Sequence, residues 1–305
     1  MLHGRRFGEF DMPTPEDSTP LYGELFESAK RLSFDLRNDS TDAHIDLDWY
    51  GMTPEWSPLY GTPTWNRMAE TERMQLTRRE VSHFLGVAIW LEVALQIVLL
   101  RRNHSVDPTR ADVKFLFNEC ADENLHSLMF VAAIERLGER HSPLDRLLVV
   151  VGWLFRTFAW GEVAYGIVLA GEEIFDVMQR DWSIDDRVAP AVRRSSHVHV
   201  VEESRHMSFA RQKIRDHLRS VSSVRRNVSA VLIAVGAHVI ARGLVNKKVY
   251  LDLGLDWRAV KDDIDRNEQH RMMFRRATAP LVEFLAREGL LNTVAGTIYR
   301  KSNLL

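Results

Sequence analysis

The sequence has almost no cysteine, and this limits both its cross-links and its expected location. Its 305 residues include a single cysteine, Cys120, which excludes an internal disulfide. The N-terminal stretch MLHGRRFGEFD lacks the apolar segment of a signal peptide. These two features predict a protein of the reducing cytoplasm.

The chain also lacks a charge bias, a glycine-rich phosphate loop and runs of alternating apolar and polar residues. Its 40 basic residues are scattered among 42 acidic ones, so we expect no nucleic-acid partner. The missing phosphate loop argues against nucleotide or flavin binding, and redox chemistry would therefore need an external electron donor. The missing alternation predicts an all-α protein.

No apolar run is long enough and free enough of charge to predict a membrane span. The most apolar one, Phe84 to Leu100, has 17 residues and contains Glu92 and Gln96. We therefore expect a buried helix of a bundle and no membrane partner. An isolated buried carboxylate is costly, so Glu92 needs a cation or a proton.

The most informative stretch is HVHVVEESRH, which carries metal-competent side chains at helical spacing. His199, Glu203 and His206 occupy positions i, i+4 and i+7. At about 100° per residue they lie within roughly 60° of one another on a helix. One Glu-x-x-His alone is more often a solvated ion pair than a ligand pair, so a single copy is weak support for a metal site.

A second copy 80 residues upstream strengthens the prediction. The stretch NECADENLH carries the same spacing in three residues: Glu119, Glu123 and His126. Each copy also follows a glutamate in an apolar helix, because Glu92 precedes Glu123 by 31 residues and Glu172 precedes Glu203 by 31. This regularity favours Glu172 over its neighbour Glu173, which we expect to face outward.

The candidate metal ligands are therefore Glu92, Glu123, His126, Glu172, His199, Glu203 and His206. In ferritin-like bundles, di-iron and di-manganese sites take one Glu from each of two helices and a Glu-x-x-His motif from each of two others. Carboxylates offset the charge of two divalent cations, and imidazoles suit iron. We predict two iron ions, with manganese as the alternative, bridged by Glu123 and Glu203.

Two further acidic residues lie one position before the bridging glutamates. Asp122 and Glu202 could each accept a hydrogen bond from the free ring nitrogen of the opposite motif's histidine, as ligating histidines usually require. The alternative is that both are surface charges, and the sequence favours neither interpretation.

The rest of the chain is predicted to extend a four-helix bundle at both ends, as one domain. Residues 1–76 form an arm packed on the bundle, with a helical pattern at 21–36, and residues 77–305 form the bundle and C-terminal helices. A crossover at 144–158 would join the two halves, and 224–251 and 257–286 are predicted as further helices. The first long helix is expected to start at a capping box, Thr77 to Glu80. Later helices are expected to start at Asp107, Ser142, Asp185 and Asp256.

These residues resemble the ferritin-like di-iron aminoarene N-oxygenases, of which para-aminobenzoate N-oxygenase is the type. The resemblance covers roughly Thr77 to Arg215 and is most specific in H-x-x-x-E-x-x-H, His199 to His206. Most di-iron bundles of this class have only two histidines. The resemblance implies an enzyme of secondary metabolism that oxidises an aryl amine through hydroxylamine to nitro with O2, by a peroxo di-iron species.

The resemblance also implies a substrate pocket beside the metals. Four side chains project from the ligand-bearing faces, although core packing explains them equally well: Leu95, Tyr165, Val168 and Phe175. We expect a homodimer supplied with electrons by an external donor.

Other interpretations of the same residues remain open. An iron-oxidising or iron-storing bundle would use the Glu and Glu-x-x-His set but has no use for His199. A desaturase or a radical-generating subunit remains an alternative, the latter with Tyr165 as the nearest candidate radical site. A helical scaffold without metals is least favoured, because all seven candidate ligands are present.

Overall fold

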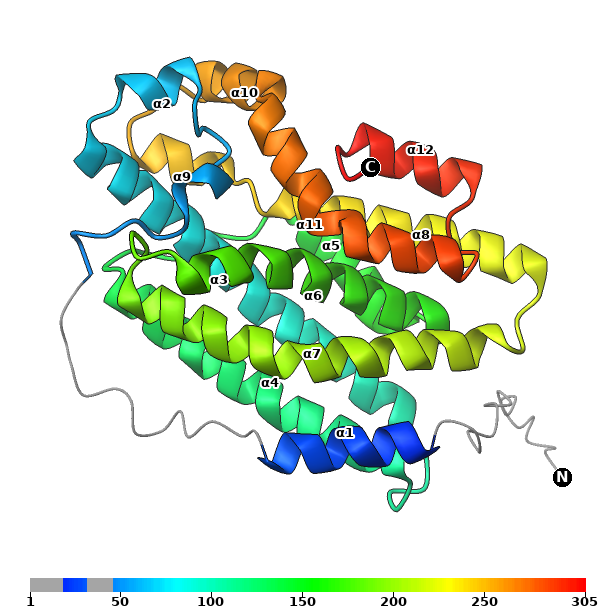
Figure 1. Cartoon of the computed structure of the whole chain (residues 1–305). Helices are drawn as coiled ribbons and strands as arrows, with labels where there is room; N and C mark the ends of the chain where they lie inside the picture. The colour runs from blue at the N-terminus through cyan, green and yellow to red at the C-terminus, as the bar shows by residue number, and fades with distance from the viewer. Residues whose placement is uncertain (1–18, 32–45) are drawn as a thin grey trace, which may run out of the picture.

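The computed structural model describes residues 19–31 and 46–305 (Figure 1). Within these ranges the chain consists of α-helices, one short 3-10 helix and connecting segments. The described residues contain no β-strand beyond an isolated bridge between Tyr50 and Val188. The prediction of an all-α protein is therefore confirmed.

Four long helices form the central bundle. They are α3 (Glu70–Asn103), α4 (Ala111–Arg136), α6 (Gly161–Ile184) and α7 (Pro190–Leu218). Helix α3 packs on α4, α6 packs on α7, and contacts between α4 and α7 and between α3 and α6 close the bundle. Helix α5 (Arg146–Phe158) lies against α3 and α8 and connects the two halves, where we predicted the crossover.

The predicted start of the first long helix was wrong. Helix α3 begins seven residues earlier than Thr77, at Glu70, and the backbone N–H of Ala69 donates to Glu72 at 2.7 Å. Thr77 instead accepts a hydrogen bond from the backbone of Gly51. The segment before the helix packs over its first turns, so Thr77 lies in a tertiary contact rather than at a cap.

Three other predicted starts precede the observed ones by a few residues. Asp107 and Asp185 accept hydrogen bonds from the backbone two residues ahead, so each stabilises a local turn before α4 or α7 begins. Helix α5 is capped by Asp145 rather than Ser142. The cap at Asp256 is correct, and Gly138 ends α4 with a φ of 65°.

The C-terminal part contains more helices than predicted. The expected helix at 224–251 is divided into α8 (Ser223–Gly243) and α9 (Lys247–Asp252), and the one at 257–286 into α10 (Trp257–Arg266) and α11 (Glu268–Arg287). In each case an asparagine, Asn246 or Asn267, caps the second helix with its side chain. Helix α12 (Thr293–Lys301) follows and packs on α8.

The N-terminal part contacts the bundle at two places. Helix α1 (Thr19–Arg31) packs on α4 and α7, and residues 32–36 of its predicted extent lie outside the described residues. Short helices η2 (Pro54–Trp56) and α2 (Pro63–Arg67) lie near α11 and α10. The Trp56 indole donates to Asp181 of α6 at 2.9 Å, which ties this segment to the bundle.

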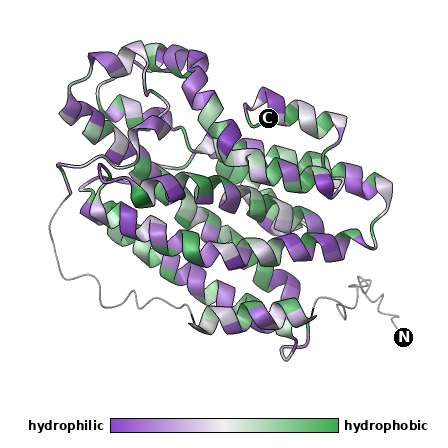
Figure 2. Ribbon diagram, viewed as in Figure 1, coloured by the Kyte–Doolittle hydropathy of each residue, from purple (hydrophilic) through white to green (hydrophobic). Residues whose placement is uncertain are grey.

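Two apolar helical stretches are long enough to cross a membrane by composition alone. They are Glu70–Asn103 and Ser223–Asp252, and 61% and 56% of their most apolar windows are buried within the protein. Core helices of a bundle share this property, so it is weak support for a membrane span. Figure 2 shows hydrophobic and hydrophilic residues mixed along the bundle helices.

Candidate metal centre

The four bundle helices bring all seven candidate ligands into one buried cluster. Each of the seven side chains is at most 5% exposed. Helix α3 contributes Glu92 and α6 contributes Glu172, while α4 and α7 contribute the two Glu-x-x-His motifs. The spacing places the donors of each motif on the inward face of its helix.

The donor atoms lie close enough together for metal binding. Four groups have ligand atoms within 4.8 Å of one another: Glu92, His126 and His199; Glu119, Glu123 and His206; Glu123, His126 and Glu203; and Glu172, His199 and Glu203. Both Glu123 and Glu203 occur in two groups, which supports their proposed role as bridging carboxylates. His199 also occurs in two groups and so lies between the Glu92 side and the Glu172 side of the cluster.

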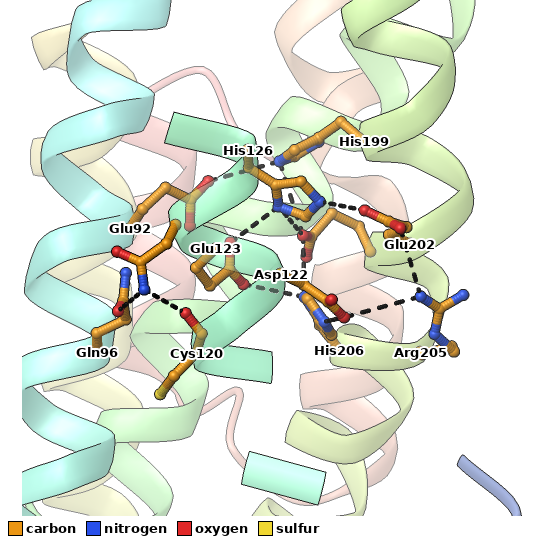
Figure 3. A network of polar contacts seen from close by, with 12 residues as sticks. Glu92, Gln96, Cys120, Asp122, Glu123, His126, His199, Glu202, Arg205 and His206 are labelled. Atoms are coloured by element: carbon orange, nitrogen blue, oxygen red, sulfur yellow. Dashed lines mark hydrogen bonds and ion pairs between the residues drawn. The ribbon is translucent and has the colours of Figure 1, made fainter. Parts of the chain in front are cut away.

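The two motif histidines turn the same ring nitrogen toward the middle of the cluster (Figure 3). His126 Nδ1 is 3.0 Å from Glu123 and 3.3 Å from Glu203, and His206 Nδ1 is 2.9 Å from Glu123 and 3.0 Å from Glu203. Each glutamate therefore faces both histidines, as a carboxylate shared by two metals requires.

The other ring nitrogens face the two acidic residues singled out in the sequence. His126 Nε2 lies 2.7 Å from a carboxylate oxygen of Glu202, and His206 Nε2 lies 3.4 Å from Asp122. Each contact joins α4 to α7, so the acid of one motif orients the histidine of the other. The Glu202 contact is a hydrogen bond and supports its proposed role beside a ligating histidine, whereas Asp122 lies only at ion-pair distance, since His206 Nε2 has no hydrogen-bond partner.

The carboxylates of the cluster are buried close together, and this shifts the pKa values of the cluster residues. Burial and repulsion from Glu123 and Glu172 raise the pKa of Glu92 well above its usual value. Desolvation opposes the charged form of His126, but its hydrogen bonds to Glu123 and Glu202 raise its pKa to about 10. Bound protons thus supply positive charge that metal cations would replace, and metal binding should release protons.

Several donor atoms of the cluster have no hydrogen-bond partner. Among the described residues, Oε2 of Glu92, Oε2 of Glu172 and both ring nitrogens of His199 are buried and form no hydrogen bond, although His199 Nε2 lies 3.5 Å from Oε1 of Glu92. A buried polar atom without a partner costs about 1–3 kcal/mol. Burial also lowers the pKa of His199 to about 4, which keeps the imidazole neutral and able to bind a metal. The donor set therefore fits two iron ions, with manganese as the alternative.

The expectation that Glu173 faces outward was wrong. Its side chain is only 2% exposed and forms an ion pair with Arg211 of α7. Helix α6 contacts α7, α8 and α11, so most of its surface is buried and a charged residue there needs a partner. Glu173 belongs to none of the donor groups found among the described residues, whereas Glu172 does.

One residue of the site had no distinguishing signal in the sequence. Arg205 is 4% exposed, and its guanidinium lies 3.9 Å from both Asp122 and Glu202 (Figure 3). Its position next to His206 in ESRH could have suggested a role, but an arginine on a helix usually reaches solvent. In the structure it lies between the two acids that orient the histidines.

The four candidate substrate-pocket residues lie in the packed interior. Leu95, Tyr165 and Val168 belong to one core cluster, whereas Phe175 belongs to another and packs on Phe84 with ring centroids 4.5 Å apart. Their role in a substrate pocket stays a prediction. A cavity of 630 Å³ opens elsewhere, among aromatic and charged residues of the segments 48–74 and 186–187.

A known protein family matches most of the chain. The family described as p-aminobenzoate N-oxygenase AurF matches residues 16–289, which include every candidate ligand.

Curated relatives carry no assigned activity. Uncharacterised proteins of Mycobacterium bovis and of Mycobacterium tuberculosis are each 26% identical to this chain over 231 residues. The match covers 71% of this chain and 66% of each relative, so it spans slightly less than two thirds of the relatives' length.

Among solved structures, R2-like ligand-binding oxidase has a similar fold. A tyrosine-to-phenylalanine mutant of that protein, with an anaerobically reconstituted Mn/Fe cofactor, gives a TM-score of 0.50 at 13% identity. The match covers 94% of this chain and 99% of that structure. The similarity confirms the predicted ferritin-like fold.

Proposed function

This chain belongs to the p-aminobenzoate N-oxygenase AurF family, and on that premise we propose that it N-oxygenates an aryl amine with O2. The amine would be oxidised to the hydroxylamine and then to the nitro compound. Family and fold indicate a di-iron oxygenase in any case. The observation that carries the finer proposal is His199, a third histidine in the cluster with both ring nitrogens unbonded.

The residues of the cluster would hold the metal pair as follows. Glu92 and His126 would bind one metal, Glu172 and His206 the other, and Glu123 and Glu203, which face both histidines, would be shared between the two. A reduced iron pair held there would supply the electrons and the open coordination positions that O2 activation needs. The bundle would supply the carboxylate charge that keeps both cations bound.

Neighbouring side chains orient the histidines and exclude water from the centre. Glu202 would hold the outer ring nitrogen of His126 through a hydrogen bond, and Asp122 would favour the same orientation of His206 through its negative charge. Phe130 packs against His199 with ring centroids 5.0 Å apart. Such apolar contacts limit solvent access and protect reactive oxygen species from side reactions.

The partners of the enzyme follow from the same proposal. We expect a small aryl amine and O2 as substrates, an external electron donor and a cytoplasmic location. Exposed apolar residues on α3 and α4, including Ile97, Leu128 and Val131, support a contact between two copies in a homodimer. Sedimentation analysis would test that contact, and a monomer at all concentrations would contradict it.

Iron content and product analysis test the proposed function. The purified protein should hold about two iron atoms per chain, with magnetic coupling that indicates a bridged pair. After reduction and exposure to O2, an aryl-amine panel followed by mass spectrometry should yield hydroxylamine and nitro products.

Three results would point elsewhere. One isolated metal per chain would contradict the metal pair. Iron oxidation without amine turnover would favour an iron-oxidising bundle, and a tyrosyl radical signal would favour a radical-generating subunit.

A further inference from the structure

The cluster contains one buried carboxylate that the proposed seven-ligand set does not use. Glu119 lies on α4, one turn before Glu123, and is 1% exposed. Its ligand atom lies within 4.8 Å of donors on both Glu123 and His206. Glu119 therefore belongs to the metal cluster by distance, on the side of His206.

Glu119 has no hydrogen-bond donor that would explain its burial. Its Oε2 is buried and unbonded, and the attraction that favours its charged form comes from His206, a member of the same donor group. Glu80 provides a contrast, because it is also buried but accepts hydrogen bonds from Ser57 at 3.2 Å and Tyr250 at 3.0 Å. A buried carboxylate needs a cation or a proton, and Glu119, unlike Glu80, lies among donors that could hold a cation.

The position of Glu119 is equivalent to that of His199. Each residue precedes the bridging glutamate of its own helix by four positions, and each is grouped with a histidine of the other helix. His199 lies with His126, and Glu119 lies with His206. The two halves of the bundle thus present one additional donor each, a neutral nitrogen from α7 and an oxygen from α4.

We propose that Glu119 is an eighth ligand of the centre, bound to the metal on the His206 side. This inference rests on the proposed metal pair. The four carboxylates of the seven-ligand set carry four negative charges, which balance two Fe²⁺ ions. Two Fe³⁺ ions carry six positive charges, so a fifth carboxylate offsets part of the excess, and a hard oxygen donor suits a trivalent cation. Glu119 therefore stabilises the oxidised pair.

The substitution Glu119→Gln tests this assignment in protein loaded with ⁵⁷Fe. The side chain keeps its shape but loses its negative charge. We expect iron binding to persist, the Mössbauer doublet of one iron to change, and the midpoint potential of the pair to rise. Glu80→Gln removes a buried carboxylate outside the cluster. It should leave the Mössbauer doublets and the midpoint potential as they are in the parent protein.

The outcomes separate this inference from the proposed function. If the parent protein holds no iron pair, the centre itself is refuted. If the parent holds two irons and Glu119→Gln has the same doublets and potential, Glu119 is a structural acid and the inference is overturned. Should Glu119→Gln not fold, Glu119→Asp retains the charge on a shorter side chain. A changed doublet of one iron in that variant supports ligation, and unchanged doublets overturn it.

Discussion

Two adjacent glutamates of α6 provide a matched test of the metal centre. Glu172 shares a donor group with His199 and Glu203, and burial with repulsion from nearby carboxylates raises its pKa well above the usual value. Glu173, also buried, is paired with Arg211 instead. Glu172→Gln should therefore weaken metal binding, and Glu173→Gln should not. Glutamine preserves side-chain volume in both variants.

The expected magnitude follows from metal linkage. Loss of a hydrogen-bond partner of a ligand costs about 10–100-fold in metal affinity, so loss of the ligand itself should cost at least about 100-fold. A metal present at about 100 times its Kd stabilises the folded state by about 2.7 kcal/mol. Unfolding 305 residues carries an entropy of about 0.6 kcal/mol/K. Glu172→Gln should therefore remove about 4 °C of the metal-induced rise in Tm.

Thermal melts of metal-free and metal-loaded protein measure this difference. Each variant is compared with its own metal-free form, so any effect on the fold itself is subtracted. Iron per chain, measured on the same samples, should fall for Glu172→Gln and remain at about two for Glu173→Gln. An equal metal-induced rise in both variants, or a loss confined to Glu173→Gln, would refute the assignment of Glu172.

Three further perturbations address the third histidine, a buried acid and the arginine of the cluster. His199→Ala should retain substantial iron, because the other ligands remain, but lose most amine oxidation by mass spectrometry; turnover at the parent rate would make His199 a packing residue. Burial outweighs the hydrogen bonds to Glu80 and raises its pKa to about 8, so the folded state keeps this proton longer than the unfolded state does. The free energy of unfolding should therefore fall by up to about 4 kcal/mol between pH 4.5 and 8, and urea titrations of Glu80→Gln should show a smaller fall; equal falls would contradict this. Arg205→Met should reduce Mn²⁺ affinity about 10-fold in calorimetry, because Asp122 and Glu202 lose the guanidinium that holds them in place and so orient the histidines less well. Unchanged affinity would show that the two acids need no such partner.

Much of the candidate site could be predicted from the sequence because it depends on local helix geometry. The helical repeat places residues three, four and seven positions apart on one face, whatever the helix packs against. Glu92 was identifiable because a carboxylate in an apolar helix needs a partner, and Glu172 because it repeats the spacing of Glu92. The structure places both within the cluster.

Errors arose where a local signal competed with a tertiary contact. The capping pattern at Thr77 to Glu80 is valid for a helix start, but both residues bind the segment that packs over α3. Glu173 and Arg205 are charged, and charge usually indicates solvent exposure. Their burial depends on contacts with helices from distant parts of the chain, and a local sequence pattern does not predict such contacts.

The sequence by itself determined the helical class, the donor types and their register, since these follow from side-chain chemistry and the helical repeat. Only the tertiary structure decided which donors meet across helices. His126 meets Glu202 across 76 residues, and Glu119 lies with His206 instead of with its own motif's histidine. Such pairings depend on how α4 packs against α7, because the packing of two helices is determined by the shapes of both surfaces together.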